Sequence, residues 1–138
     1  MDKLKTGSKN YTKLIITIVI IAALVSLMVF SNVTVKLSDT KIDVRCGMDH
    51  YTVLVEDITS VETISSLAVG VRVMGADLIT KYSGTFKNDT YGSYKLFIYK
   101  ESGSCIEITT TKGVVVLNQK TAEDTLSLYE NIKALIGE

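Results

Sequence analysis

Hydrophobic residues follow three different patterns along the chain. Residues 14–30 form an unbroken apolar run that contains no charged residue. From residue 33 to residue 117, short segments alternate between apolar and polar positions, which predicts β-strands with one buried face. Between residues 125 and 136, apolar side chains recur at helical spacing. The order therefore predicts an apolar helix, then a series of strands, then one amphipathic helix.

The apolar run at residues 14–30 predicts a single transmembrane helix. At about 1.5 Å per residue the run covers roughly 25 Å, slightly less than the hydrocarbon core of about 30 Å, and Val33 and Val35 can extend it. A lone strand in lipid would leave its backbone unpaired, so a helix is favoured despite the many Ile and Val residues. A cleaved secretory signal is one alternative, although no A-x-A site follows, and a buried core helix is another.

Positive charge is concentrated before the apolar run, because residues 1–13 contain four lysines and one aspartate. The positive-inside rule places this head in the cytoplasm and the remainder of a single-pass cell-membrane protein outside. Removing these charges from the totals of 15 basic and 15 acidic residues leaves 11 basic and 14 acidic residues. An acidic balance argues against nucleic acid or acidic lipid as the main partner of this remainder.

The polar remainder predicts one compact domain at residues 33–137, after a basic head at 1–13 and a transmembrane helix at 14–31. Turn signals divide it into about seven short antiparallel strands, and residues 65–81 are irregular enough to predict a long excursion between sheets. Thr121 with Asp124 predicts the start of the final helix, and Gly137 its end. The fold class is mainly β with a C-terminal α-helix: a seven-stranded orthogonal barrel or sandwich capped by one helix.

The residues that could support chemistry do not form a convincing catalytic or metal-binding pattern. His50 is the only histidine and is predicted to lie in a solvated turn beside Asp49. Alternation directs Cys46 inward, away from that turn, and directs Cys105 outward on the face of Glu107. We therefore expect two free thiols, although an outside location permits a disulfide, and we expect no enzyme activity, no cofactor and no metal site.

Three segments carry a resemblance to the bacterial pleckstrin-homology-like (PH-like) families of small membrane-anchored proteins: YTVLVEDITSVETI, VRVMGADLITKYSGTFKNDTYGSYKLFIYK and IEITTTKGVVVLNQKTAEDTLSLYENIK. The resemblance covers nearly all of residues 33–136 and implies the PH-like fold. For bacterial members it implies an interaction or assembly module. Many eukaryotic PH domains bind inositol phosphates through basic residues near the first two strands. Here Asp39 and Asp43 interrupt the basic residues of that region, which argues against phosphoinositide binding.

We therefore expect a non-catalytic, single-pass membrane protein that presents a PH-like domain to a protein partner. The alternative is a membrane-tethered sensor of a small ligand or lipid. Loops on a rigid scaffold commonly carry binding residues, so the excursion and the segment after it contain the candidate interaction surface. Its expected residues are Arg72, Tyr82, Phe86 and Lys87.

Overall fold

The computed structural model describes residues 2–138, which separate into two compact units that meet in the sequence between Ser31 and Asn32. The first unit is dominated by helix α1 (Asp2–Phe30). From Lys9 to Leu27 this helix has a mean hydropathy of 1.9 and no buried residue. The chain therefore has one N-terminal helix that is long and apolar enough to cross a membrane.

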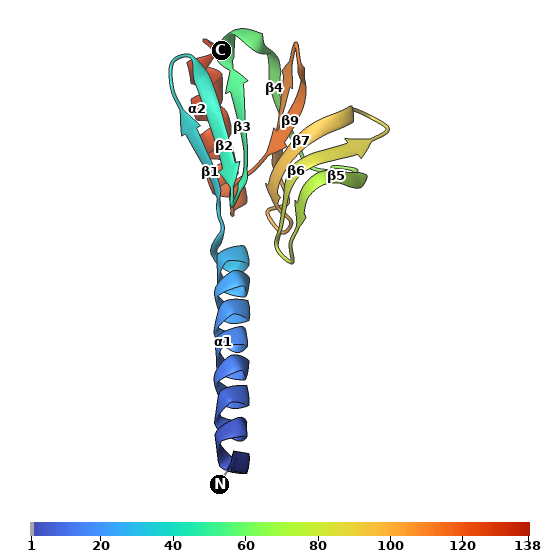
Figure 1. Ribbon diagram of the computed structural model, residues 1–138. Helices are drawn as coiled ribbons and strands as arrows, with labels where there is room; N and C mark the ends of the chain where they lie inside the picture. Colours follow the sequence, from blue (N-terminus) through green and yellow to red (C-terminus); the bar gives the residue numbers. More distant parts are fainter. Residues whose placement is uncertain (1) are drawn as a thin grey trace. The chain divides into compact units, whose positions relative to one another are not determined.

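The second unit contains nine strands in two sheets, followed by helix α2 (Ala122–Leu135) (Figure 1). The smaller sheet has the order β1-β2-β3 and consists of β1 (Val33–Leu37), β2 (Lys41–Cys46) and β3 (Asp49–Leu54). A single 3₁₀ turn (Val55–Asp57) leads into the larger sheet. The larger sheet has the order β4-β8-β9-β7-β6-β5, with β4 (Ile58–Ile64), β5 (Val71–Asp77), β6 (Lys81–Asn88), β7 (Gly92–Tyr99), β8 (Cys105–Thr110) and β9 (Gly113–Leu117).

This architecture confirms the predicted fold class and adds two strands to the seven expected. The expected excursion at residues 65–81 contains β5, which pairs with β6 as the outermost strand of the larger sheet. The pairing of β7 with β9 is parallel rather than antiparallel, from Lys95 opposite Val115 to Phe97 opposite Leu117. The β8–β9 hairpin contacts β7 through β9, and β8 lies on the side of β9 away from β7. The chain reverses direction between β7 and β8 and again between β8 and β9, so β9 runs parallel to β7.

The main hydrophobic core lies between the two sheets and α2. It includes Ile42 and Val44 from the smaller sheet, Phe97 and Ile108 from the larger sheet, and Ile132 from the helix, each at most 1% exposed. Burial of a side chain of this size contributes about 1.5–3 kcal/mol relative to exposure. The strict alternation of β2, with buried Ile42, Val44 and Cys46, shows how the period of two creates one core-facing side.

A second, smaller cluster occupies the other face of the larger sheet. Its buried members are Phe86, Tyr94, Leu96, Ile98, Cys105 and Val116, and residues of the segment between β4 and β5 pack against them. The prediction that Cys105 faces solvent is therefore wrong. Alternation assigned its face correctly, but both faces of the larger sheet are covered at this position. Both cysteines are buried, and both are free thiols, as expected for their redox state.

Local hydrogen bonds determine where the final elements begin and end. The Thr121 hydroxyl accepts a hydrogen bond from the Asp124 backbone N–H at 3.1 Å, so Thr121 is the N-cap of α2 as predicted. Before the helix, Asn118 is 1% exposed, and its Oδ1 accepts from the Tyr99 backbone N–H at 2.7 Å. Its Nδ2 donates to the Tyr99 and Ser104 carbonyls at 3.1 Å each. This amide continues the β7–β9 pairing beyond Leu117.

Candidate functional site

Strand β5 is the edge strand of the larger sheet, and its apolar side chains are exposed. Val71, Val73 and Met74 are 64%, 58% and 72% exposed, although these residue types are usually buried in strands. In Figure 1, β5 is the green strand at the outer margin of the sheet. Within the described residues, its only neighbour in the sheet is β6. The strand therefore presents its other edge, and its backbone polar groups, to solvent.

A β-bulge determines which side chains of β5 share a face. Val71 lies opposite Lys87 and Arg72 lies opposite Phe86, but the register then shifts so that Met74 lies opposite Thr85. Opposite residues in an antiparallel pair share a face. The extra residue, Val73, therefore returns Met74 to the face of Val71 and Lys87.

The structure brings the predicted surface residues together on β5 and β6, with one exception. Arg72 and Lys87 are exposed, and Tyr82 is half-buried. Phe86 is 1% exposed and belongs to the second hydrophobic cluster, so it cannot form part of a surface. The sequence does contain a strand signal in Val71-Arg72-Val73, but the flanking glycines favoured an irregular segment instead.

Two glycines allow β5 to lie close to β6. Gly75 and Gly84 face each other with φ values of +113° and +117°. A Cβ atom on Gly75 would lie 2.1 Å from the Ser83 carbonyl oxygen, and one on Gly84 would lie 2.3 Å from the Met74 carbonyl oxygen. No side chain fits at either position, so this contact depends on glycine.

Polar and aromatic contacts hold the end of β5 against the sheet. Lys100 Nζ lies 2.6 Å from Asp77 Oδ1 and 4.3 Å from the centroid of the Tyr82 ring. The Tyr82 ring in turn packs edge-to-face on Phe86, with ring centroids 5.5 Å apart. These contacts connect the exposed edge strand to the second cluster and give it a defined position.

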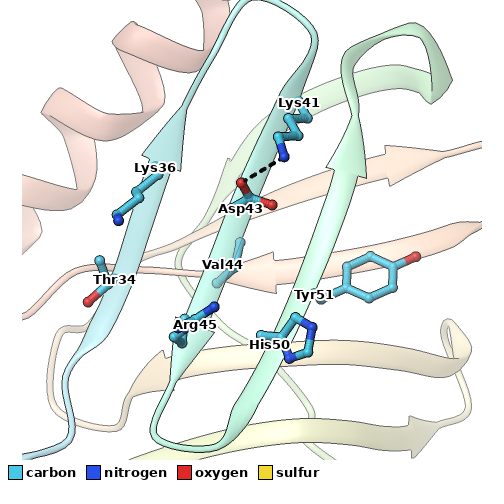
Figure 2. Close-up of a pocket in the computed structure, with 8 residues that line it drawn as sticks. All are labelled: Thr34, Lys36, Lys41, Asp43, Val44, Arg45, His50 and Tyr51. Carbon is cyan, nitrogen blue, oxygen red and sulfur yellow. Dashed lines mark ion pairs between the residues drawn. The ribbon is translucent and has the colours of Figure 1, made fainter.

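A second feature is a hollow of about 390 Å³ on the outer face of the smaller sheet (Figure 2). Two rows of opposed residues cross this face. One row consists of Thr34, Arg45 and His50, and the other of Lys36, Asp43 and Thr52. Arg45 and His50 are both exposed. His50 lies on β3 rather than in the turn predicted for it.

The carboxylate of Asp43 balances part of the positive charge in this hollow. The Thr52 hydroxyl donates to Asp43 Oδ1 at 2.6 Å, and Lys41 Nζ lies 3.5 Å from Oδ2. The hydroxyl of Thr52, with Lys41 and Arg45 assisting against partial burial, lowers the pKa of Asp43. Asp43 is therefore ionised at neutral pH, and the hollow combines both signs of charge.

A second hollow of about 270 Å³ lies between the segment after β4 and the turn after β7. It is lined by Leu67, Tyr82, Lys100, Cys105 and Asn118, among others. Burial raises the pKa of the Cys105 thiol, so the thiol is protonated and unreactive at neutral pH. Among the described residues, no three His, Cys, Asp or Glu side chains are grouped so that they could hold a metal ion.

Comparison with known sequences identifies the class of this domain. A mainly β unit with two sheets, a shared core and a closing C-terminal helix is the arrangement of PH-like domains. The sequence model described as a bacterial PH domain matches residues 33–130. The chain belongs to the bacterial PH domain family. Searches of the curated proteins and of the solved structures found no significant match.

Proposed function

We propose that this chain is a non-catalytic membrane protein in which α1 is the anchor and the PH domain binds an extended segment of a partner protein along β5. The observation that supports this function is the edge strand with Val71, Val73 and Met74 exposed. A strand added to β5 would pair with backbone groups that β6 does not use. Main-chain hydrogen bonds would supply affinity, and alternate side chains would supply selectivity.

The side chains around β5 indicate the chemistry of that segment. Val71 and Met74 share a face of the sheet. A partner strand should therefore carry apolar side chains at every second position, on the face that it shares with Val71 and Met74. Arg72 and Lys87 add positive charge at the same end of the strand, which favours an acidic residue in the partner. An extended segment with alternating apolar residues and an acidic residue fits this edge.

We further propose that the N-terminal head lies in the cytoplasm and that the domain lies on the outer side of the cell membrane. The four lysines of residues 1–13, before the apolar run of α1, support this orientation. Fusions of alkaline phosphatase and of green fluorescent protein to the C-terminus test it, because the first is active outside and the second folds inside. The mass of the membrane-bound chain separates an anchor from a cleaved signal, since cleavage would remove the helix.

Site-specific crosslinking in cells tests the binding site. A photoreactive amino acid at Val73 should form an adduct with one defined protein. Val71→Lys with Met74→Lys should abolish the adduct, because lysine disfavours pairing at an edge strand. Leu126→Lys is the matched control, since Leu126 is an exposed apolar residue of α2 that is 52% exposed. Adducts with lipid alone, or an adduct unchanged by the double substitution, would contradict the proposal.

A second candidate function is a sensor of a small anionic ligand, and the hollow of the smaller sheet favours it. Lys36, Lys41 and Arg45 supply three positive charges there against the single charge of Asp43. A thermal-shift screen of the full chain in detergent against anionic metabolites tests this function. A stabilising compound should lose its effect with Arg45→Ala and retain it with the edge-strand substitutions.

A further inference from the structure

The two most exposed large apolar side chains of the domain both lie at turns. Met48, in the β2–β3 turn, is 99% exposed, and Ile79, in the β5–β6 turn, is 92% exposed. Neither side chain contributes to a hydrophobic cluster of the fold. Turn positions usually carry polar or small residues, so two such side chains need a separate explanation.

The turn that carries Met48 lies at the end of the domain where the chain enters from α1. Val33, the first residue of β1, is opposite Cys46, the last residue of β2. Cys46 is in turn opposite Asp49, the first residue of β3. The β2–β3 turn is therefore beside the entry point, and the β1–β2 turn is at the opposite end.

The turn that carries Ile79 lies at this same end. It leads into Lys81, which is opposite Tyr99 at the end of β7. The Tyr99 hydroxyl accepts from the Val33 backbone N–H at 3.0 Å. The Ser83 hydroxyl donates to Asp49 at 2.7 Å, which connects the start of β6 to the start of β3. In Figure 1 the β2–β3 and β5–β6 turns both lie at the end of the domain where β1 begins.

We propose that Met48 and Ile79 insert into the interfacial layer of the lipid bilayer and hold the domain on the membrane surface. This inference rests on the proposed anchor. Only Ser31 and Asn32 connect α1 to β1, so the Cα atoms of Phe30 and Val33 are at most about 11 Å apart. If α1 spans the bilayer, the end of the domain that carries both turns is at its surface.

The covalent connection explains why two side chains are sufficient. A soluble domain with two apolar turn residues would bind lipid weakly, whereas a tethered domain makes the same contact within one molecule at high effective concentration.

The acidic residues nearest the turns also have partners. Asp49 accepts a hydrogen bond from Ser83, and Asp77 is paired with Lys100. Both pairings reduce the cost of bringing these carboxylates towards a lipid surface.

Fluorescence quenching in membranes tests this inference on the full chain. Met48→Cys and Ile79→Cys are each labelled with an environment-sensitive fluorophore and reconstituted into vesicles of phosphatidylethanolamine and phosphatidylglycerol, with or without brominated acyl chains. Asp39→Cys, in the exposed β1–β2 turn at the opposite end, carries the same label as a control. The parent chain measures background labelling of the buried Cys46 and Cys105.

The labels at positions 48 and 79 should show blue-shifted emission and strong quenching by brominated lipid, and the label at position 39 should show neither. Adding Ile79→Asp to the Met48→Cys chain should reduce quenching at position 48, which excludes an effect of the fluorophore alone. Equal quenching at positions 48, 79 and 39 would overturn the inference while the anchor stands. Failure of the chain to remain with vesicles after an alkaline wash would overturn the anchor, and this inference with it.

Discussion

The Tyr99 hydroxyl, at the end of β7, accepts a hydrogen bond from the backbone N–H of Val33, the first residue of β1, at 3.0 Å. Val33 is 4% exposed, so this N–H group is removed from water as well as paired. The contact joins β1, the strand that follows α1, to β7 near the centre of the larger sheet. It holds the entry point of the domain in register with the rest of the fold.

Tyr99→Phe should lower the free energy of unfolding by about 1–2 kcal/mol, because the buried Val33 N–H would lose its partner. Urea unfolding of the full chain in detergent, followed by tyrosine fluorescence, measures this change. Tyr51→Phe is the control, since it removes a hydroxyl for which no hydrogen bond is found among the described residues. Equal stability of the two variants would show that the Tyr99 contact contributes nothing.

Gly75→Ala should destabilise the domain by roughly 3 kcal/mol or more, because a Cβ would collide with the Ser83 carbonyl oxygen at a positive φ. Gly103→Ala is the comparison, because Gly103 also has a positive φ, of +75°, but has no atom within 4 Å of its Cβ position. It should cost only about 1 kcal/mol. The difference between the urea concentrations at which the two variants are half unfolded measures the cost of the steric collision beyond that of a positive φ.

The stability of the domain should fall as the pH rises from about 10 to about 12. Burial raises the pKa of Tyr94 to about 12, and its hydroxyl donates to the Val69 carbonyl at 2.7 Å. A tyrosine in the unfolded chain loses its proton near pH 10, so above this pH the unfolded state binds fewer protons than the folded state. The contribution is complete below pH 10 and is lost through this interval.

Tyr94→Phe provides the comparison for the alkaline transition. The variant should lose less stability between pH 10 and pH 12 than the parent chain, by up to about 1.4 kcal/mol per pH unit. A residual slope should remain, because burial also raises the pKa of Tyr91 and Tyr99. Identical slopes for the two chains would show that Tyr94 does not retain its proton preferentially in the fold.

Both cysteines should resist alkylation while the domain is folded. Burial is the main cause of the raised pKa of Cys46 and of Cys105, and only the thiolate reacts rapidly. Treatment with iodoacetamide at pH 8, read by mass spectrometry, should leave the native chain largely unmodified and modify two sites in urea. Rapid modification of either thiol in the native chain would contradict its burial.

The pattern of alternation predicted the faces of strands better than it predicted what covers them. It placed Cys46 in the core, and it grouped Cys105 with Glu107 on the opposite face. Phe86 and Cys105 are nevertheless buried, because the segment between β4 and β5 packs over that face. A period of two indicates which residues share a side of a sheet, but only the tertiary fold determines whether a second layer covers it.

The candidate site shows the same limit. Arg72, Tyr82 and Lys87 lie on the paired strands β5 and β6, whereas the sequence indicated an irregular excursion for the segment that carries Arg72. In the sequence Gly75 indicates an interruption, whereas in the fold it permits close pairing with Gly84. Local sequence contains the glycine but not the strand opposite it. Thr121 was predictable because its partner, Asp124, is only three residues away.

Asn118 has a consequence for the uniqueness of the fold. Because residues 96–98 of β7 are apolar and buried on both faces of the sheet, a shift of the register by one residue would exchange apolar side chains for one another there, at a smaller cost than in a strand with one wet face. The Asn118 amide bonds both backbone groups of Tyr99, and a shifted strand would leave this buried amide without partners. A single polar side chain thus disfavours a one-residue shift of β7 against β9 that the neighbouring apolar side chains oppose only weakly.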